Sequence, residues 1–303
     1  MNETDFIWVN GKMVKWKEAT THVLTHSLHY GSGVFEGIRC YDTEKGPAVF
    51  RLKEHIKRFF ASAELIYLKV PFTEIEILEA VKEIVRKNKL KECYIRPIAY
   101  YGYGKMGLDT TGAKVDVVVA AWPWGAYLGE EGLKNGIRAK VSSYCRPHPK
   151  SVPIHSKTTG VYVNSTLAKM EALSTGFEEA VMLDYKGNVA ECSGENIFIV
   201  KNGVLITPPL ELCLAGITRD SVIELAKKKG IKVVEKAFQK EELLSADECF
   251  ITGTAAEITP VREIDNNKIG SGAAGKITAM IQEEYKKVIH GNNKDCLGWL
   301  EFV

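Results

Sequence analysis

Apolar and polar positions in the first third of this chain alternate with two different periods. Residues 94–101 and 115–122 are rich in apolar side chains, which predicts two strands, the second of them buried. Residues 52–66 and 78–85 place apolar side chains three or four positions apart, which predicts two helices with one buried face each. An Asn-Gly pair at residues 10–11 predicts a tight hairpin, because both residue types adopt the positive φ angles of such turns.

The pattern is interrupted once before the second half. Pro123 and several glycines break every period in residues 123–136, so we expect no regular element there and interpret 125–136 as an interdomain loop. Strands joined by hairpins and interspersed helices are typical of an α+β fold. We therefore expect a small N-terminal domain at 1–124 and a larger one at 137–303. The elements predicted in the second domain are a strand at 137–144, a helix around 167–173, hairpin turns at 186–188 and 202–203, a helix at 219–229, strands at 231–234 and 249–252, and a helix at 277–288.

Composition limits the class of protein. Hydrophobic residues make up 45% and charged residues 26% of the 303 positions, as in ordinary soluble enzymes. The 40 basic and 38 acidic side chains nearly balance, and the basic ones are not concentrated as a nucleic-acid groove requires. The seven cysteines contain no Cys-x-x-Cys pair, so we expect free thiols and a cytoplasmic protein. We see no leader and no apolar run of the roughly 18 residues that span a membrane.

Lys157 is the first candidate for chemistry. It lies among small hydroxylated residues, before a glycine and a predicted helix. A lysine that bonds covalently to an aldehyde must lose its proton near neutral pH, which requires desolvation or a neighbouring cation. The alternative is a solvated lysine on a surface loop.

A second candidate comprises two carboxylates and an amide, Glu191, Glu195 and Asn196, directly before a strand that we expect to be buried. An isolated buried carboxylate is costly and needs a partner. A pyridine nitrogen is one such partner, because a carboxylate beside it keeps the ring protonated and able to accept electrons. The alternative is that one glutamate caps a hairpin and the other is solvated.

Two further segments could bind an anion. Gly216 precedes Thr218, which we expect to cap a helix, and Asp220 suits its first turn. The first N–H groups of such a helix form an anion site, although plain capping without a ligand explains these residues equally well. Residues 252–260 follow a predicted strand, and their small side chains leave backbone N–H groups accessible to a carboxylate or phosphate.

Three histidines, His22, His26 and His29, are spaced four and three positions apart. On one helix face they could bind a metal. No other pair of ligand-type residues has matching spacing, so we expect no metal site.

Eight motifs, each weak alone, occur in order along the chain. They are Tyr-Gly-Ser-Gly-Val-Phe-Glu-Gly-Ile-Arg at 30–39, Arg51 and Leu52 with His55 and Arg58, Tyr-Ile-Arg-Pro at 94–97, Pro-Trp-Gly-Ala-Tyr-Leu-Gly at 123–129, Ser-Lys-Thr at 156–158, Glu191 with Gly-Glu-Asn at 194–196, Gly-Ile-Thr-Arg at 216–219, and Gly-Thr-Ala-Ala-Glu at 253–257. Together they resemble the branched-chain aminotransferases of fold type IV, over about residues 6 to 290.

The resemblance implies a fold of two mixed α/β domains with pyridoxal 5′-phosphate at their interface. Lys157 is implied to be catalytic: it binds the cofactor's aldehyde and, once substrate displaces it, moves the proton from the substrate Cα. Glu191 is implied to face the pyridine nitrogen, Tyr162 the phenolic oxygen, and Leu214 one ring face. The residues implied around the cofactor phosphate are Arg58, Ile217, Thr218 and Thr254, and Gly216 and Gly253 are also implied to bind the cofactor.

The implied reaction moves an amino group between L-leucine, L-isoleucine or L-valine and 2-oxoglutarate, so one pocket must accept aliphatic and glutamate side chains. The resemblance assigns the glutamate γ-carboxylate to Arg96. The substrate α-carboxylate is assigned to Tyr94 and to the N–H groups of Thr254 and Ala255. The other pocket residues are Phe35, Gly37, Trp124 and Tyr127, with Tyr30 and Leu108 from a neighbouring subunit. A homodimer is then the smallest active assembly, a homohexamer is an alternative, and residues 127–136 are expected to form a lid.

Two other functions fit parts of the sequence. D-amino-acid aminotransferases and aminodeoxychorismate lyases resemble the chain around Lys157 and Glu191, but are not expected to share the motifs at 94–97 and 123–127. A non-catalytic ligand- or metal-binding protein has no need of the whole set. The sequence does not distinguish among leucine, isoleucine and valine.

Overall fold

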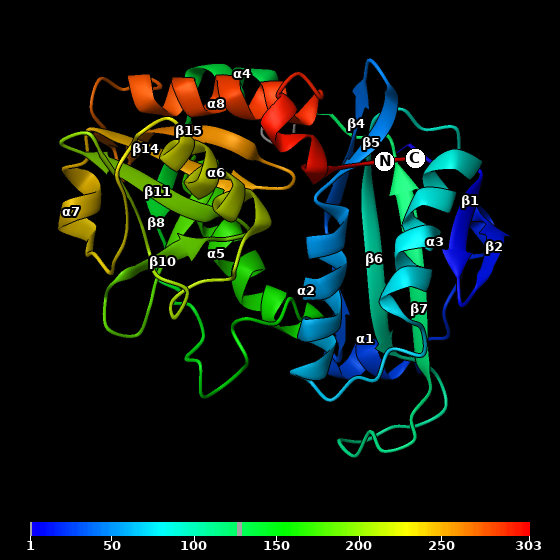
Figure 1. Ribbon diagram of the computed structural model, residues 1–303. Helices are drawn as coiled ribbons and strands as arrows, with labels where there is room; N and C mark the ends of the chain where they lie inside the picture. The colour runs from blue at the N-terminus through cyan, green and yellow to red at the C-terminus, as the bar shows by residue number, and fades with distance from the viewer. Residues whose placement is uncertain (1, 126–128) are drawn as a thin grey trace. The chain divides into compact units, whose positions relative to one another are not determined.

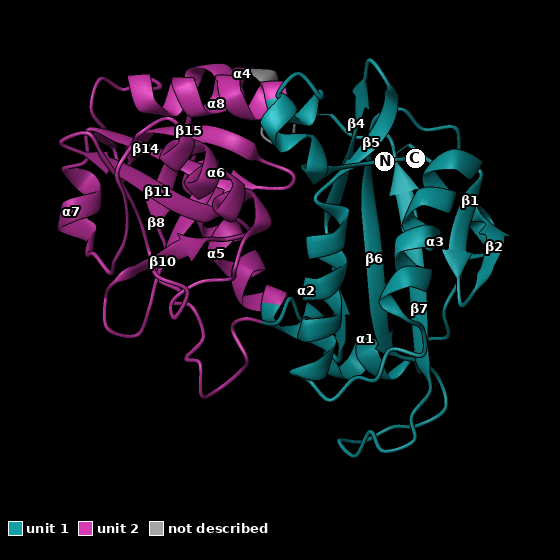
Figure 2. Ribbon diagram, in the orientation of Figure 1, with its two compact units in different colours: residues 1–125, 156–161, 288–303 teal, residues 126–155, 162–287 magenta. Residues whose placement is uncertain are grey.

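The computed structural model describes residues 2–125 and 129–303, which form two compact units (Figures 1 and 2). Of these residues, unit 1 contains 2–125, 156–161 and 288–303, and unit 2 contains 129–155 and 162–287. Each unit combines one sheet with helices, which confirms the expected α+β class. The expected domains at 1–124 and 137–303 stay a prediction, and the compact units differ from them by including segments that return from later in the chain.

Unit 1 is built on an eight-stranded sheet in which every recorded pairing is antiparallel. Its path runs β17-β5-β4-β6-β7-β1-β2, and β3 pairs with β6. The strands are β1 (Phe6–Val9), β2 (Lys12–Lys15), β3 (Gly33–Phe35), β4 (Ile38–Thr43), β5 (Gly46–Phe50), β6 (Cys93–Tyr101), β7 (Val115–Trp122) and β17 (Leu300–Phe302). The helices are η1 (Trp16–Glu18), α1 (His26–Tyr30), α2 (Leu52–Glu64), α3 (Glu74–Lys87), η2 (Thr159–Val161) and η3 (Lys294–Trp299).

The core of unit 1 lies between this sheet and helices α2 and α3. Buried side chains of α2 and α3, such as Phe59 and Ile84, pack with Ile95 and Ala99 of β6. Each large apolar side chain buried in this way contributes about 1.5–3 kcal/mol. Because side chains alternate along a strand, the intervening residues of β6 lie on the opposite face of the sheet, and the candidate site residues of this strand are among them.

Unit 2 is built on a nine-stranded mixed sheet with the path β10-β9-β8-β15-β14-β11-β12-β13 and with β16 paired to β15. The pairs β8–β9, β8–β15 and β12–β13 are parallel. The strands are β8 (Ile137–Val141), β9 (Glu179–Leu183), β10 (Val189–Cys192), β11 (Asn196–Lys201), β12 (Val204–Thr207), β13 (Val233–Glu235), β14 (Glu248–Gly253), β15 (Glu257–Ile264) and β16 (Asn267–Lys268). The helices are α4 (Gly129–Asn135), α5 (Tyr162–Ser174), α6 (Ile217–Lys228), α7 (Lys240–Leu244) and α8 (Lys276–Ile289), the last two residues of which belong to unit 1.

Three expectations about local structure are wrong. Residues 129–135 form helix α4 in spite of their glycines; the helix contacts β15, and the carbonyl of Leu133 accepts a bond from Gln282 (3.0 Å). Tertiary contacts therefore outweigh the roughly 1 kcal/mol that a helical glycine costs. Strand β8 ends at Val141, short of the expected residue 144. Thr218 does not cap α6, because the helix begins at Ile217, two residues earlier than expected, with Gly216 at the N-cap.

Candidate active site

Lys157 belongs to a short segment that unit 1 takes from the middle of the chain. Its backbone N–H donates to Ser62 Oγ on α2 (3.0 Å), and its carbonyl accepts from the N–H of Phe35 (3.1 Å). The neighbours Ser156 and Thr158 are buried, Lys157 is partly buried, and its Nζ lies 5.0 Å from the centre of the Phe35 ring. This fixed, partly desolvated setting favours a chemical role over that of a solvated surface lysine.

A close approach of two glycines attaches the Lys157 segment to the loop after α1. The N–H of Gly160 donates to the carbonyl of Gly31 (3.0 Å), and Thr159 Oγ1 donates to the same carbonyl (2.7 Å). Gly31 has φ +63°, and a Cβ there would lie 2.6 Å from Gly160 Cα. Both the positive φ and the contact require glycine at this position.

Arg58, the residue expected to bind phosphate, lies on α2 and pairs with Glu36. Its Nε is 2.6 Å from Glu36 Oε1 and its Nη2 is 2.9 Å from Oε2. His55 Nδ1 lies 2.7 Å from the same Oε2. Burial would raise the pKa of Glu36, but the charge of Arg58 and the bonds from His55 and Arg58 hold this pKa well below its usual range. Burial lowers the pKa of His55, against the bond to Glu36. The sequence analysis assigns no role to Glu36 or His55.

Tyr94 and Arg96 lie on the face of β6 that α2 and α3 leave uncovered. Arg96 Nη2 donates to the Tyr94 hydroxyl (3.1 Å), and its guanidinium lies 4.7 Å from the centre of the Phe35 ring. Arg96 Nε is buried without a hydrogen-bond partner among the described residues, and no described carboxylate pairs with Arg96. Such a cation suits an anionic ligand group. A Cβ on Gly37 would lie 2.0 Å from the Tyr94 hydroxyl oxygen, so this position requires glycine.

Trp124 extends an aromatic surface from Tyr94 across the end of β7. Its ring centre lies 5.5 Å from that of Tyr94 and 6.0 Å from that of Trp122. Tyr30 and Leu108, which we expect to serve a neighbouring subunit, are 44% and 86% exposed, as residues available to a partner must be. Tyr127 lies outside the described residues.

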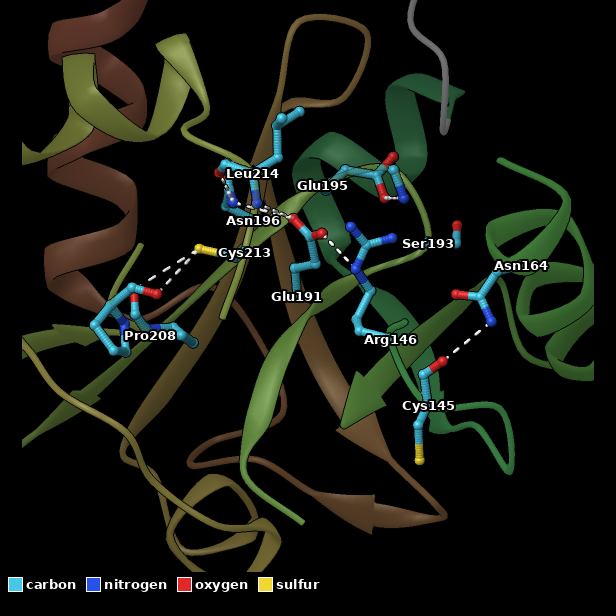
Figure 3. Close-up of polar contacts among 12 residues, drawn as sticks. Cys145, Arg146, Asn164, Glu191, Ser193, Glu195, Asn196, Pro208, Cys213 and Leu214 are labelled. Carbon is cyan, nitrogen blue, oxygen red and sulfur yellow. Dashed lines mark hydrogen bonds and ion pairs between the residues drawn. The ribbon is translucent and has the colours of Figure 1, made fainter. Parts of the chain in front are cut away.

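Glu191 is a buried carboxylate of unit 2 with three polar partners (Figure 3). It is 6% exposed, and its Oε1 lies 2.8 Å from Arg146 Nε. Its Oε2 accepts from the N–H of Leu214 (3.1 Å) and from Asn196 Nδ2 (3.4 Å). Glu195 is also only 6% exposed, so the alternative that one of the two glutamates is solvated is wrong. The ion pair with Arg146 supplies the partner that a buried carboxylate needs.

The first turn of α6 offers unsatisfied donors in unit 2. Ile217 and Thr218 are buried, and within the part of the chain that the structure describes their backbone N–H groups have no hydrogen-bond partner. A Cβ on Gly216 would lie 1.8 Å from Asn196 Oδ1, so glycine is required where this turn meets the Glu191 cluster. Buried orphan N–H groups at a helix N-terminus suit a phosphate.

The turn between β14 and β15 offers a second set of donors. β14 ends at Gly253 and β15 begins at Glu257, and the N–H groups of Thr254 and Ala255 between them lack partners among the described residues. Both residues are partly buried. The prediction that this segment presents backbone N–H groups to an anion therefore has a structural basis.

The structure divides the predicted residues between its units. Unit 1 holds Tyr30, Phe35, Gly37, Arg58, Tyr94, Arg96, Leu108, Trp124 and Lys157, and unit 2 holds Tyr162, Glu191, Leu214, Gly216, Ile217, Thr218, Gly253, Thr254 and Ala255. Tyr162 is the first residue of α5. Three contacting side chains were missed by sequence reasoning, Glu36 and Ser62 in unit 1 and Arg146 in unit 2. Of these three, only Glu36 could have been found from the sequence, because it is a carboxylate within an otherwise apolar and glycine-rich run. Arg146 lies in an irregular loop, and no sequence pattern indicates a role for it.

Other features bear less on the site. The three histidines do not converge: His26 bonds to Ser32 Oγ (2.6 Å) and the Gly107 carbonyl (2.7 Å), and His29 bonds to the Val23 carbonyl (2.9 Å). Among residues 2–125 and 129–303, no three metal-ligating side chains gather as a metal site needs. Within the same residues no helix combines the length and apolarity of a membrane span. A cavity of about 600 Å³ beside Phe60, Tyr67 and Leu68 is lined by none of the predicted site residues.

Comparison with known families gives one match over most of the chain. Residues 33–264 match the family described as amino-transferase class IV. The branched-chain-amino-acid aminotransferase of Pseudomonas aeruginosa is 50% identical over 297 residues, which cover 98% of this chain and 97% of that protein.

Solved structures agree with this match. The crystal structure of the Escherichia coli branched-chain amino acid aminotransferase is 47% identical and aligns with a TM-score of 0.97 over 99% of both chains. The branched-chain amino acid aminotransferase of T.th., complexed with N-(5′-phosphopyridoxyl)-L-glutamate, is 46% identical, with a TM-score of 0.96 over 100% of this chain and 99% of the other.

Proposed function

The chain belongs to the class IV aminotransferases, and on this premise we propose that Lys157 and Glu191 act on its pyridoxal 5′-phosphate. The enzyme is a branched-chain-amino-acid aminotransferase, EC 2.6.1.42, which moves the amino group between a branched-chain L-amino acid and 2-oxoglutarate. The fold is that of type IV. The assignment of residues rests on two fixed polar settings, the anchored segment of Lys157 in unit 1 and the buried, ion-paired Glu191 in unit 2.

The residues present fit the cofactor. The orphan N–H groups of Ile217 and Thr218 and the guanidinium of Arg58 suit a doubly charged phosphate. Glu191, held by an ion pair with Arg146 and by two N–H donors, offers a fixed carboxylate to the pyridine nitrogen. When bound, the protonated ring supplies an electron sink for the charge that develops at the substrate Cα. The chain's own work is therefore positioning, neutralising charge and moving one proton.

Lys157 performs the proton transfer in this proposal. Its segment is fixed by Ser62 and Phe35 on either side of the peptide, so the side chain begins from a defined backbone position. The free amine of Lys157 would take the proton from the substrate Cα and deliver it to the C4′ carbon of the cofactor, and it would move a proton in the opposite direction in the second half-reaction. A base held in reach of one face of the substrate also explains selection of one enantiomer.

Acceptance of both leucine and glutamate follows from the mixed character of the Tyr94 face. Phe35, Trp124 and Tyr94 offer aromatic surface to an aliphatic side chain. Arg96, buried at Nε without a partner among the described residues, offers charge to a γ-carboxylate. The N–H groups of Thr254 and Ala255 bind the α-carboxylate that both substrates share. In this proposal a neutral side chain uses the aromatic surface and a charged one uses Arg96, both in unit 1.

We further propose a homodimer in which Tyr30 and Leu108 complete the neighbouring site. The surface around α1 exposes several apolar residues, and His26 ties this helix to the loop after β6 through Gly107 (2.7 Å). The exposed apolar residues of this surface are Val23, Leu24, Leu28, Tyr30, Tyr103, Met106 and Leu108. So much clustered apolar surface is typical of a protein–protein interface. A homohexamer of such dimers is the larger alternative.

The cytoplasm is the proposed location. None of the seven cysteines, all of which lie among the described residues, forms a disulfide, and all but Cys145 are buried. This is expected of thiols kept in a reducing compartment.

An absorption spectrum of the purified enzyme tests the assignment. We expect a band of lysine-bound cofactor that L-leucine converts to the amine form and 2-oxoglutarate restores, with no response to D-leucine. The Lys157→Ala variant should bind the cofactor without this band and without turnover. Response to D-leucine alone would mean a D-amino-acid aminotransferase, and a wild-type band in Lys157→Ala would remove Lys157 from its role.

A further inference from the structure

Glu36 is a completely buried carboxylate to which the reaction assigns no part. It lies between β3 and β4 and has 0% exposure. All of its recorded partners are donors of unit 1: Arg58 through Nε (2.6 Å) and Nη2 (2.9 Å), His55 through Nδ1 (2.7 Å), and the N–H of Gly37 (3.2 Å). A charge so fully withdrawn from water is costly, and it persists only where several donors compensate it.

The pairing with Arg58 is a fork in which two N–H groups meet two carboxylate oxygens. Two parallel bonds fix the plane of the guanidinium as well as its distance, which one bond does not do. His55 and Arg58 stand three positions apart on α2 and therefore share one face of the helix. His55 must carry its proton on Nδ1, because an ionised carboxylate can only accept. Glu36 thus holds Arg58 while His55 holds Glu36.

Two opposing effects on a bound phosphate follow from this arrangement. The negative charge of Glu36 repels a phosphate, which weakens binding. The fork holds Arg58 in one orientation before the ligand arrives, which strengthens binding because less side-chain freedom is lost. The charge of Arg58 offsets much of this repulsion, and the two bonds of the fork fix the orientation of the guanidinium.

We propose that Glu36 is a positioning residue that orients Arg58 toward the 5′-phosphate of the cofactor. The inference rests on the proposed function, since it requires that Arg58 bind the phosphate. It assigns a purpose to the buried charge: selection of the phosphorylated form of the cofactor. Pyridoxal, which has the ring and the aldehyde but no phosphate, should gain nothing from Glu36.

The test compares dissociation constants of pyridoxal 5′-phosphate and of pyridoxal for the enzyme after its cofactor has been removed. Glu36→Gln should weaken binding of the phosphate form by about tenfold, the lower end of the loss seen when the hydrogen-bond partner of a metal-ligating side chain is removed. Binding of pyridoxal should change less than about twofold. Glutamine cannot replace the carboxylate, because its amide nitrogen would face donors in either orientation.

Glu54→Gln is the matched control. Glu54 also pairs with an arginine, Arg51 (2.8 Å), and lies on the same helix, but it belongs to no part of the site. It should leave both constants unchanged. Glu36→Asp keeps the charge, but its side chain is one methylene group shorter. This variant should lose part of the preference for the phosphate form. If Glu36→Gln does not fold, Glu36→Asp decides the question alone.

Each remaining outcome counts against a different statement. A preference for the phosphate form within twofold of wild type in a folded Glu36 variant, or tighter phosphate binding, would overturn the inference and leave the proposed function intact. Equal weakening of both ligands would show that Glu36 is only structural. A wild-type enzyme that binds neither ligand would overturn the proposed function, and the inference with it.

Discussion

At the scale of single residues, Arg146 and Glu191 form a buried ion pair in unit 2. Their side chains are 9% and 8% exposed, and their charged atoms are 2.8 Å apart. Removing one member of a buried ion pair leaves a charge without compensation, whereas removing both does not. Replacing either residue alone should therefore lower the free energy of unfolding more than replacing both.

Replacing Arg146 should be costly for this reason. We expect Arg146→Met to lower the free energy of unfolding by about 3–5 kcal/mol, and Arg146→Met with Glu191→Gln to recover a large part of it. Urea unfolding at pH 7 measures both. Equal stability of the single and double variants would contradict the assigned pairing.

His55 should make the stability of the protein depend on pH. Burial lowers its pKa below the ordinary 6.5, more than the bond to Glu36 raises it. Below about pH 6.5 the unfolded chain therefore binds a proton at this position more readily than the folded chain, and stability falls as the pH falls. The Tm of wild type should decrease more steeply between about pH 6.5 and 5 than that of His55→Gln. Parallel curves would mean that His55 is not held neutral.

Gly37 must lack a side chain for Tyr94 to keep its position. A methyl group here would lie 2.0 Å from the Tyr94 hydroxyl oxygen, so Tyr94 must move by an ångström or more. A displacement of that order costs about 100-fold in rate. We expect Gly37→Ala to lower kcat/KM for L-leucine by about this factor with cofactor binding retained, and steady-state kinetics with an absorption spectrum tests both. Gly298→Ala, in unit 1 and with no atom within 4 Å and no positive φ, controls for the loss of a glycine as such.

At the scale of elements, periodicity predicts the sheets and helices that are patterned by burial. The hairpin at Asn10-Gly11, strand β7 and the buried stripe of α3 are confirmed, because each depends on local φ preferences or on alternation with solvent. The predictions for residues 129–135 and for the first residue of α6 are wrong, because contacts with distant residues, Gln282 and Asn196, help to determine the structure there. The candidate site shows the same division: motif residues were found by resemblance, while Arg146 and Ser62 matter through contacts that no spacing reveals.

Helix α2 serves the site along one face, through His55, Arg58 and Ser62. Ser62 is fully buried; its Oγ accepts from the Lys157 N–H (3.0 Å), and its carbonyl accepts from Ser156 Oγ (2.8 Å). Ser62→Ala should leave the Lys157 N–H without an acceptor and lower stability by about 1–3 kcal/mol. Thermal unfolding measures this loss. The rate of amide hydrogen exchange should increase most at residues 156–158. Unchanged exchange there would mean that α2 does not hold the segment.

At the scale of the whole molecule, the proposed crossing of Tyr30 and Leu108 makes the dimer testable by mixing. A Lys157→Ala chain lacks the base but can lend Tyr30 to a partner, and a Tyr30→Ala chain retains the base. Heterodimers of the two should contain one complete site, so activity of the mixture should exceed that of either variant alone. Activity that only averages the two would mean that each chain uses its own Tyr30.

The strand pairing of unit 1 has a consequence for biosynthesis of the chain. β5 pairs with β17, Leu300 opposite Phe50, so this side of the sheet is completed by residues that leave the ribosome long after the rest of it. Segment 156–161 also joins unit 1 only after part of unit 2 has been made. Domains usually fold during synthesis in the order in which they emerge. Here the nascent unit 1 must wait with an unpaired strand edge, which makes β5 the place where a chaperone, or another nascent chain, would bind first.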